Sequence, residues 1–267
     1  MNVPADPPVP DLSLEGLFGL ADTVSLVTGA TSGIGLASAE ALARAGSRLM
    51  ITGLGDAEAT ADRLAERVGV EVLGVTADLR DGEAVTAIVD RALSAWGRID
   101  TVVANAGVAR DRPGANIHDA LTDLDEMFDV HVKSVLRLAD ATLPLLAVRG
   151  GAFLVMSSLS GLRGNTSIGG YGITKAANAQ LARNIAVQWG GRGVRANSLS
   201  PGVIDTEFAR PLTADPSVAS KRLAKTPLGR FGTPAEVAAA VVWLASAGGA
   251  FVNGQNIVID GGTLIAD

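Results

Sequence analysis

Short apolar runs alternate with longer amphipathic stretches along most of this chain, and that alternation strongly limits the folds it can adopt. Seven runs have the composition of strands, at residues 24–28, 48–52, 70–75, 101–104, 152–156, 194–198 and 256–259. They are largely continuous rather than alternating, which is typical of strands covered on both faces. Amphipathic stretches lie at residues 35–45, 58–68, 82–96, 121–147, 172–189 and 234–245. This order predicts an α/β fold with a doubly wound parallel sheet of about seven strands and helices on both faces.

Length and composition predict a single domain. The chain has 267 residues, of which 48% are hydrophobic and 19% charged, and α/β domains of this size are often undivided. The sequence contains no internal repeat, low-complexity block or interdomain linker. Residues 1–10 carry four prolines and little that a core can bury. We therefore predict a flexible tail at 1–10 and one domain over 11–267.

Composition also excludes several classes of function. The net charge of −6 argues against a nucleic-acid partner, because such proteins present a basic face. The lack of cysteine excludes thiolate metal sites and cysteine nucleophiles, and with two histidines we expect no metal site. The first residues lack the features of a secretory signal, and the apolar stretch at 237–247 is too short to cross a bilayer. We expect a cytoplasmic protein with no membrane partner.

One long segment, residues 201–233, fits neither pattern. It contains Pro201, Pro211, Pro216 and Pro227 among small and apolar residues. A long connection after a strand of a doubly wound sheet is more often a functional lid than slack chain. We therefore predict a substrate lid over residues 201–233.

A glycine-rich sequence, TGATSGIG at residues 28–35, lies between the first predicted strand and the first predicted helix. Gly29, Gly33 and Gly35 permit a tight turn and a close approach of the backbone to a pyrophosphate, which then binds N–H groups at the helix N-terminus. An unliganded glycine turn is the alternative, but the strand–turn–helix context favours a dinucleotide site. Ser32 and Ile34 are further candidate contacts of this site.

Four motifs together resemble the short-chain dehydrogenase/reductase family. They are the glycine loop, Asn105-Ala106-Gly107, Tyr171-x-x-x-Lys175 and Pro201-Gly202, and the likeness runs from about residue 20 to residue 262. The resemblance implies a Rossmann-type fold and hydride transfer between NAD(P)(H) and a secondary alcohol or ketone. Within the family the chain is similar to the 3-oxoacyl reductase and 3-hydroxybutyrate dehydrogenase branch.

The end of the second strand bears on the choice between NAD and NADP. An acidic residue here would bind the adenosine ribose, and an arginine nearby would accept a 2′-phosphate. By resemblance the acidic position falls on Gly53 and the arginine position on Leu54, so the chain departs from both patterns. No Lys or Arg occurs between Arg48 and Arg63 to neutralise a 2′-phosphate. We therefore predict NAD(H), assisted by Asp56, with NADP as the alternative.

The resemblance implies further cofactor contacts. Asp78 and Leu79 correspond to the residues beside the adenine ring, although Asp78 can equally be read as a helix N-cap or turn residue. Asn105 corresponds to a residue that braces the sheet near the cofactor, and Thr206 to one that holds the nicotinamide carboxamide. Ile204 and Pro201 complete this set.

Tyr171 and Lys175 are the candidate acid/base pair. Tyr171 is the sole tyrosine, and the i, i+4 spacing places both side chains on one helix face. A free tyrosine has a pKa of about 10, and a neighbouring ammonium stabilises its phenolate form. Ser158, at the family's spacing before Tyr171, is the candidate that orients the substrate oxygen, and Ser157 is its rival. An exposed helix face without function is the alternative for the pair.

His131 stands where many relatives carry an asparagine that feeds a proton relay to the lysine. It lies on an inward-facing helical stripe with Leu124, Val135 and Leu138. A lone inward histidine is often a satisfied core residue, whereas a relay histidine would pass protons near neutral pH. Both interpretations stay open from the sequence.

Apolar residues in and near the predicted lid indicate the substrate: a small or medium, mostly hydrophobic secondary alcohol or ketone. The lid candidates are Val203, Phe208, Leu212, Val218 and Leu223. Arg163, Arg210 and Arg222 either pair with a substrate carboxylate or lie solvated on the surface, and the second role is the more common.

The sequence also bears on the assembly of the chain and leaves two alternative functions open. The family resemblance implies a homotetramer formed through the stretches at 121–147 and 172–189. Within the enzymes, the alternative is an NADPH-dependent 3-oxoacyl-type carbonyl reductase. Outside them, it is a nucleotide-binding sensor or scaffold without turnover, which would have no need of Ser158, Tyr171 and Lys175.

Overall fold

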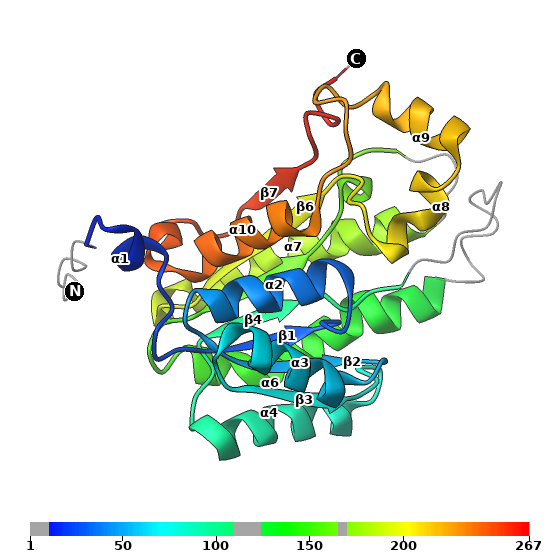
Figure 1. Cartoon of the computed structure of the whole chain (residues 1–267). Helices are drawn as coiled ribbons and strands as arrows, with labels where there is room; N and C mark the ends of the chain where they lie inside the picture. Colours follow the sequence, from blue (N-terminus) through cyan, green and yellow to red (C-terminus); the bar gives the residue numbers. More distant parts are fainter. Residues whose placement is uncertain (1–10, 109–123, 165–169, 267) are drawn as a thin grey trace.

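Seven parallel strands form one sheet in the order β3-β2-β1-β4-β5-β6-β7 (Figure 1). The computed structural model describes residues 11–108, 124–164 and 170–266. The strands are β1 Val24–Thr28, β2 Arg48–Gly53, β3 Val72–Thr76, β4 Thr101–Ala104, β5 Ala152–Met156, β6 Arg195–Pro201 and β7 Asn256–Ile259. This is the predicted single-domain Rossmann-type sheet, and the predicted tail at 1–10 lies outside the described residues.

Helices cover both faces of the sheet, as predicted. The longer ones are α2 Gly33–Arg44, α3 Ala57–Val68, α4 Gly82–Trp96, α6 Ser134–Leu146, α7 Tyr171–Trp189 and α10 Pro234–Ala245. Helix α1, Leu14–Phe18, and 3₁₀ turns at Leu159–Gly161 (η2), Gly190–Arg192 (η3) and Ala247–Gly249 (η5) complete the regular elements described outside the lid and residues 124–133, and a further 3₁₀ turn, Glu207–Ala209 (η4), lies in the lid. None of the helices in the described ranges combines the length and apolarity needed to cross a bilayer.

Two cores explain why the strand sequences are continuously apolar. Leu26 belongs to the cluster beneath α4, α6 and α7, whereas its neighbour Val27 belongs to the cluster beneath α2, α3 and α10. Met50 and Ile51 of β2 divide between the two clusters in the same way. Successive residues of a strand point to opposite faces, so a strand covered on both sides is apolar on both of its faces rather than on alternate positions.

The stretch predicted as one helix over 121–147 is interrupted. Residues 124–128 are α-helical, Asp129–Lys133 forms a single π-helical turn, and α6 begins at Ser134. Insertions of this kind are frequent at functional sites because they rotate a side chain out of the regular helical register. Here the inserted turn carries His131, which is buried.

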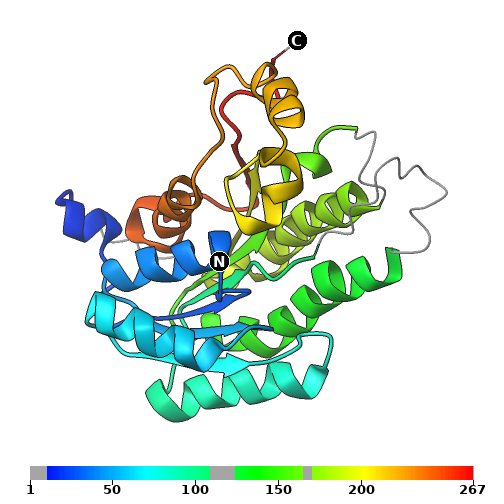
Figure 2. The same ribbon diagram turned by 45° about the vertical axis from the view of Figure 1, so that its right-hand side comes forward.

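The lid holds more secondary structure than its sequence predicts. Two short helices, α8 Arg210–Thr213 and α9 Pro216–Leu223, stand apart from the layers of the fold, beyond the carboxyl ends of the strands (Figures 1 and 2). The two ends of the segment are joined by a parallel bridge between Ile204 and Gly232. The lid therefore leaves and rejoins the rest of the fold at neighbouring points, and the bridge holds its two ends together.

The order of the strands decides where a ligand can bind. The chain builds β1, β2 and β3 outward to one side and then returns to place β4 on the other side of β1. The loops after β1 and β4 therefore leave the sheet in opposite directions and open a crevice between them. The glycine loop and Asn105 lie at this point, because they follow β1 and β4 directly.

Candidate active site

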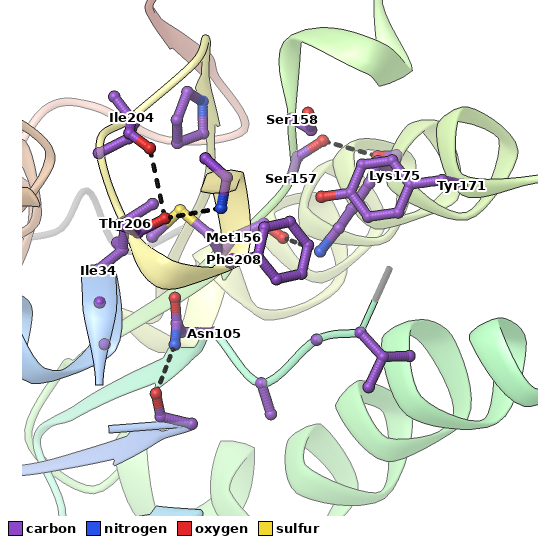
Figure 3. Close-up of a pocket in the computed structure, with 18 of the residues that line it drawn as sticks. Ile34, Asn105, Met156, Ser157, Ser158, Tyr171, Lys175, Ile204, Thr206 and Phe208 are labelled. Atoms are coloured by element: carbon purple, nitrogen blue, oxygen red, sulfur yellow. Dashed lines mark hydrogen bonds between the residues drawn. The ribbon is translucent and has the colours of Figure 1, made fainter. Parts of the chain in front are cut away.

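A cavity of about 630 Å³ lies at the carboxyl ends of the strands, between the glycine loop and the lid (Figure 3). Fourteen of the fifteen predicted cofactor residues line it: Gly29, Ser32, Gly33, Ile34, Gly35, Gly53, Asp78, Leu79, Asn105, Tyr171, Lys175, Pro201, Ile204 and Thr206. The exception is Asp56. Ser158 also lines the cavity, so strand ends, helix starts and the lid converge on one space.

The glycine loop packs too closely against its surroundings to accept side chains. A Cβ at Gly35 would lie 2.2 Å from the carbonyl oxygen of Gly29 and 2.4 Å from Nδ2 of Asn105. Gly29 itself has φ of 64°, a conformation that favours glycine. The loop thus brings the start of α2 to the cavity wall, where a pyrophosphate fits the exposed backbone and the helix dipole.

Asn105 joins the ends of β1 and β4. Its Nδ2 donates to the carbonyl oxygens of Thr28 at 2.9 Å and of Gly29 at 3.1 Å, and its backbone N–H donates to Oγ1 of Thr28 at 3.0 Å. These bonds hold the two diverging loops in register at the mouth of the crevice, which agrees with the bracing role expected from the sequence.

Asp56 does not stand where the sequence prediction needs it. Its Oδ1 accepts a hydrogen bond from the backbone N–H of Ala59 at 2.8 Å, so the carboxylate caps the N-terminus of α3 and is not among the cavity-lining residues. An aspartate directly before a helix satisfies an otherwise free N–H, and this local bond fixes the side chain. No contact in the cavity lining therefore supports the predicted assistance from Asp56 to the cofactor.

Thr31 fills the space beside Gly53. A Cβ at Gly53 would lie 2.8 Å from Oγ1 and 2.9 Å from Cγ2 of Thr31. The threonine therefore takes room that an acidic side chain at position 53 would need. Position 53 thus has glycine in place of the acidic residue expected there, and Thr31 of the glycine loop packs against it.

Arg80 is a cavity-lining cation that the sequence analysis missed. It pairs with Asp78, Nη2 to Oδ2 at 2.5 Å, and lies 3.7 Å from Oε1 of Glu126. The Arg80 guanidinium holds the pKa of the Asp78 carboxyl below its usual range. The residues directly after β2 carry no cation, whereas Arg80 follows β3. The strand order supplies the missing signal, because β3 lies beside β2.

Asp78 is also not the N-cap of the following helix. Asp81 caps α4, its Oδ1 accepting from the N–H of Glu83 at 2.9 Å. Asp78 instead lines the cavity and is held by Arg80, through both the side chain and the backbone N–H at 3.0 Å. The helix-cap alternative for Asp78 is therefore wrong, but the turn alternative is confirmed, because the Asp78 carbonyl oxygen also accepts the N–H of Asp81 at 3.1 Å.

Tyr171 and Lys175 open helix α7 at the cavity wall. The hydroxyl of Tyr171 points into the cavity, and Nζ of Lys175 lies 5.6 Å from the centre of the phenol ring (Figure 3). Lys175 is buried and its Nζ donates to the carbonyl oxygen of Met156 at 2.9 Å. Burial lowers the pKa of the Lys175 ammonium to about 8. The pair therefore combines a reachable hydroxyl with a desolvated cation.

The two serines at the end of β5 divide their roles. The Ser157 hydroxyl donates to the carbonyl oxygen of Lys175 at 2.7 Å, so it anchors α7. The Ser158 hydroxyl accepts the N–H of Ser160 at 3.1 Å, which leaves its own proton available to a ligand oxygen. This division favours Ser158 over Ser157 as the group that orients a substrate oxygen.

His131 is held at both ring nitrogens. Nε2 accepts the backbone N–H of Val108 at 2.9 Å, so the ring proton sits on Nδ1 and donates to Oγ1 of Thr174 at 2.8 Å. Thr174 in turn donates to the carbonyl oxygen of Tyr171 at 2.9 Å. Burial first, and the Lys175 charge second, lower the pKa of His131 to about 3.

A histidine in this state is neutral and fully hydrogen-bonded at neutral pH. It joins the loop after β4 to the first turn of α7, and its ring meets the Tyr171 ring edge-on with centroids 5.5 Å apart. Passing a proton would require it to break one of these bonds. The geometry therefore favours the satisfied core residue over the relay, both of which were open from the sequence.

The segment predicted as a lid contributes both apolar and charged residues to the cavity lining. Of its predicted apolar contacts, Val203, Phe208 and Leu212 line the cavity, whereas Val218 and Leu223 do not. Thr206 caps the turn at Glu207–Ala209, its Oγ1 accepting the N–H of Ala209 at 3.3 Å. Arg163 and Arg222 also line the cavity, whereas Arg210 does not line it and pairs with Glu207, which does.

Comparison with known proteins gives matches over nearly the whole chain. A family model described as enoyl-(acyl carrier protein) reductase matches residues 29–263. D-threitol dehydrogenase of Mycolicibacterium smegmatis is 37% identical over 259 residues, covering 96% of this chain and 98% of that protein. Cis-4-hydroxycyclohexanecarboxylate dehydrogenase of Sinomonas cyclohexanicum is 34% identical over 244 residues, covering 91% of this chain and 96% of that protein.

A solved structure extends the likeness to three dimensions. Gluconate 5-dehydrogenase from Burkholderia cenocepacia, in complex with NADP and tartrate, matches with a TM-score of 0.86 at 30% identity. The match covers 94% of this chain and 98% of that one. Every one of these similarities spans both the glycine loop and the catalytic helix.

Proposed function

The chain belongs to the short-chain dehydrogenase/reductase family and is an NAD(P)-dependent oxidoreductase of alcohol or keto substrates, and we propose that it uses NAD(H) and a small or medium, mostly hydrophobic secondary alcohol or ketone. The observation that carries the proposal is the convergence of Tyr171, Lys175 and Ser158 on the cavity that the glycine loop opens. The glycine cradle, which a Cβ would fill, fits a dinucleotide pyrophosphate.

In the proposed reaction the hydroxyl proton of a secondary alcohol passes to the phenolate of Tyr171 as the alcohol is oxidised to a ketone. A nicotinamide cofactor held at the glycine loop would supply the carbon that accepts the hydride lost by the alcohol. Tyr171 holds and moves the proton, since its hydroxyl points into the cavity. Lys175 stabilises the phenolate with a charge that burial has desolvated. Ser158 donates a hydrogen bond to the substrate oxygen.

The preference for NAD(H) rests on the charges in the part of the cavity lined by Gly53, Asp78 and Arg80, which we call the adenosine end because the adenosine ribose is expected there. Thr31 occupies the room beside Gly53, and no cation stands there among the described residues except Arg80, whose charge Asp78 already matches. A dianionic 2′-phosphate needs a cation of its own, whereas a ribose with free hydroxyls does not. The arrangement therefore disfavours NADP relative to NAD.

The alternative of an NADPH-dependent 3-oxoacyl-type reductase also has one observation in its favour. Arg80 lines the same end of the cavity and would serve a 2′-phosphate if Asp78 released it. Arg80→Gln separates the two assignments, because it weakens NADPH binding only if Arg80 holds the phosphate.

The first experiment measures cofactor and reaction together. NADH and NADPH are titrated separately into the protein by fluorescence, and turnover is then followed on a panel of ketones. We expect tighter binding of NADH, with turnover that is lost in Tyr171→Phe while NADH binding stays. A preference for NADPH would overturn the cofactor assignment and leave the chemistry intact. Cofactor binding without turnover on any ketone would favour the sensor or scaffold.

Assembly into a homotetramer, with the cytoplasm as location, is part of the same proposal. Helices α6 and α7 expose large apolar side chains, among them Leu136, Ile173 and the 85% exposed Val187. Such side chains on adjacent helices support a contact between copies of the chain. Light scattering on Val187→Asp tests it, because a charge placed in that contact would lower the measured mass toward that of smaller assemblies.

A further inference from the structure

Two cationic side chains in the same turn of the lid, Arg222 and Lys225, belong to the cavity lining. Arg222 lies in the last turn of α9, and Lys225 follows three residues later, so the two positions face the same side. The carbonyl oxygen of Arg222 accepts from the N–H of Lys225 at 3.1 Å and from Oγ1 of Thr226 at 3.2 Å. Oγ1 of Thr226 also bonds Oγ1 of Thr263 at 3.0 Å, which ties this turn to the C-terminal segment.

These two charges lack a counter-ion within the described part of the chain. Neither forms an ion pair there, whereas the nearby lid cations Arg210 and Arg230 are matched by Glu207 and Glu236. Arg222 is partly buried and Lys225 is exposed, and both belong to the cavity lining.

The acidic residues of the cavity do not supply the missing negative charge. Asp78 and Glu126 both lie beside Arg80 at the adenosine end, and Glu207 is paired with Arg210. Arg163, which comes shortly after the turn that begins at Ser158, adds a third cation to the lining. The part of the lining contributed by the lid and by the segment after Ser158 is therefore net positive.

Apolar side chains accompany these cations in the lining. Leu159, Val203, Phe208 and Leu212 belong to the same two segments as the cations and Ser158. The Phe208 ring packs 6.4 Å from the Tyr171 ring, centroid to centroid, which places the apolar patch directly at the reacting hydroxyl. A ligand that satisfies this surface has an oxygen for Tyr171 and Ser158, an apolar carbon skeleton and an anionic end.

We propose that the substrate of this site is a hydroxy- or oxo-carboxylate, whose carboxylate pairs with Arg222 and Lys225 while its alcohol or ketone meets Tyr171. The inference rests on the proposed function and narrows its substrate class. It assigns to Arg222 the carboxylate-binding role rather than the solvated surface role, and it adds Lys225. Arg–carboxylate pairs are strong where the guanidinium is partly desolvated and both oxygens are engaged.

The test compares oxo-acids with their methyl esters, which keep the carbon skeleton and remove the charge. The probes are 4-oxopentanoate, 6-oxoheptanoate and 4-oxocyclohexanecarboxylate, each beside its ester. We expect kcat/KM for at least one acid to exceed that of its ester by about tenfold or more, as charge-assisted hydrogen bonds imply. The advantage should shrink as salt is added, since the pair is partly exposed.

Variants then assign the advantage to residues. In Arg222→Gln/Lys225→Gln the ratio of acid to ester should fall toward one, chiefly through KM of the acid. Lys221→Gln is the matched control, because Lys221 neighbours Arg222 on α9 but is exposed and does not line the cavity. It should keep the ratio of the original chain.

Further readouts keep the outcomes distinct. NADH affinity should be equal in the original chain and the double variant, and a loss of affinity would show that the cations bind the cofactor instead. Equal kcat/KM for acids and esters, or a ratio that survives in the double variant, would overturn the inference. Acids and esters are also titrated against the NADH complex by fluorescence. A preference for acids there supports the inference even without turnover, and the lack of turnover by itself contradicts only the proposed function.

Discussion

The wall of the cavity that carries the glycine loop is made of closely packed backbone, whereas the wall that carries the lid is made of short helices without buried residues. At the first wall, Gly29, Gly35 and Asn105 are in contact at distances that leave no room for a Cβ. At the second, α8 and α9 contain no buried residue and are held mainly by the Ile204–Gly232 bridge and the Thr226–Thr263 bond. Elements with few buried contacts are the least stable parts of a fold.

The two walls therefore respond differently to substitution. The cofactor wall is built on the core, so a change there disturbs the whole domain. The lid contributes little to the core, so its side chains can change with small effects on stability. We therefore expect changes in the glycine loop and in α7, which carries Tyr171 and Lys175, to alter stability and turnover. Changes in the lid should alter substrate affinity.

Lys175→Met is expected to give the largest effect. It removes a buried charge that stabilises the Tyr171 phenolate but lowers the stability of the folded chain. Loss of phenolate stabilisation should lower kcat by about 10²–10³-fold. The folded-state pKa of about 8 lies below the ordinary 10.5, so burying the ammonium destabilises the original chain below pH 8. The variant should then be more stable by roughly 1–3 kcal/mol at pH 7.

The sign of this effect can be checked by pH. The destabilisation is fully present below pH 8 and disappears as the pH rises toward 10.5, where the unfolded chain also loses its proton. The stability gain of Lys175→Met, measured by chemical unfolding, should therefore shrink between these values. A gain that is independent of pH would contradict a buried charged lysine.

Gly35→Ala should produce the next largest effect, at the cofactor wall. Its Cβ would lie 2.2 Å from the Gly29 carbonyl oxygen, so the loop must move. We expect a loss of roughly 1–3 kcal/mol in the free energy of unfolding and a rise of more than about tenfold in Kd for NADH. Gly191→Ala is the control, because a Cβ there meets no atom within 4 Å. Unchanged NADH binding in Gly35→Ala would remove the contrast between the two walls.

His131 should give a smaller effect that depends on pH. Its pKa is lowered from 6.5 to about 3, so between these values the unfolded chain binds a proton that the folded chain does not. Stability should fall as the pH drops through this window, with a slope of up to about 1.4 kcal/mol per pH unit. His131→Asn, unfolded chemically from pH 7 to pH 4, should lack this part of the slope. An inflection of kcat near pH 6 that vanishes in the variant would instead revive the relay.

Two helix caps give the smallest effects and the sharpest comparison. Asp81 caps α4, which packs on the core, and its Oδ1 accepts the N–H of Glu83 at 2.9 Å. Asp215 caps α9 in the lid, and its Oδ1 accepts the N–H of Ser217 at 2.8 Å. Asp81→Ala should lower the free energy of unfolding by about 1 kcal/mol. Asp215→Ala should leave it within about 0.5 kcal/mol and raise KM up to about fivefold, since the lid opens locally. Equal losses of stability would show that the lid is as integral to the fold as α4.

The strands were predictable because burial on both faces leaves a continuous apolar run, and β1, β4, β5 and β7 begin and end where the sequence places them. The lid helices were not, because α8 and α9 bury nothing and their sequences carry no apolar stripe. The π turn that carries His131 was also hidden, since one inserted residue alters the helical register without altering composition.

Local sequence determined the sheet, the glycine loop and the spacing of Tyr171 and Lys175, because these depend on periodicity, backbone freedom and a single helix turn. Tertiary structure decided what lies at a distance along the chain. It brought Arg80, which follows β3, into the same cavity lining as Gly53 at the end of β2, satisfied both nitrogens of His131 and placed Arg222 in that lining. Hydrogen bonds and charges act through space, so the partner of a side chain is known only when the strands have been ordered and the lid has been placed.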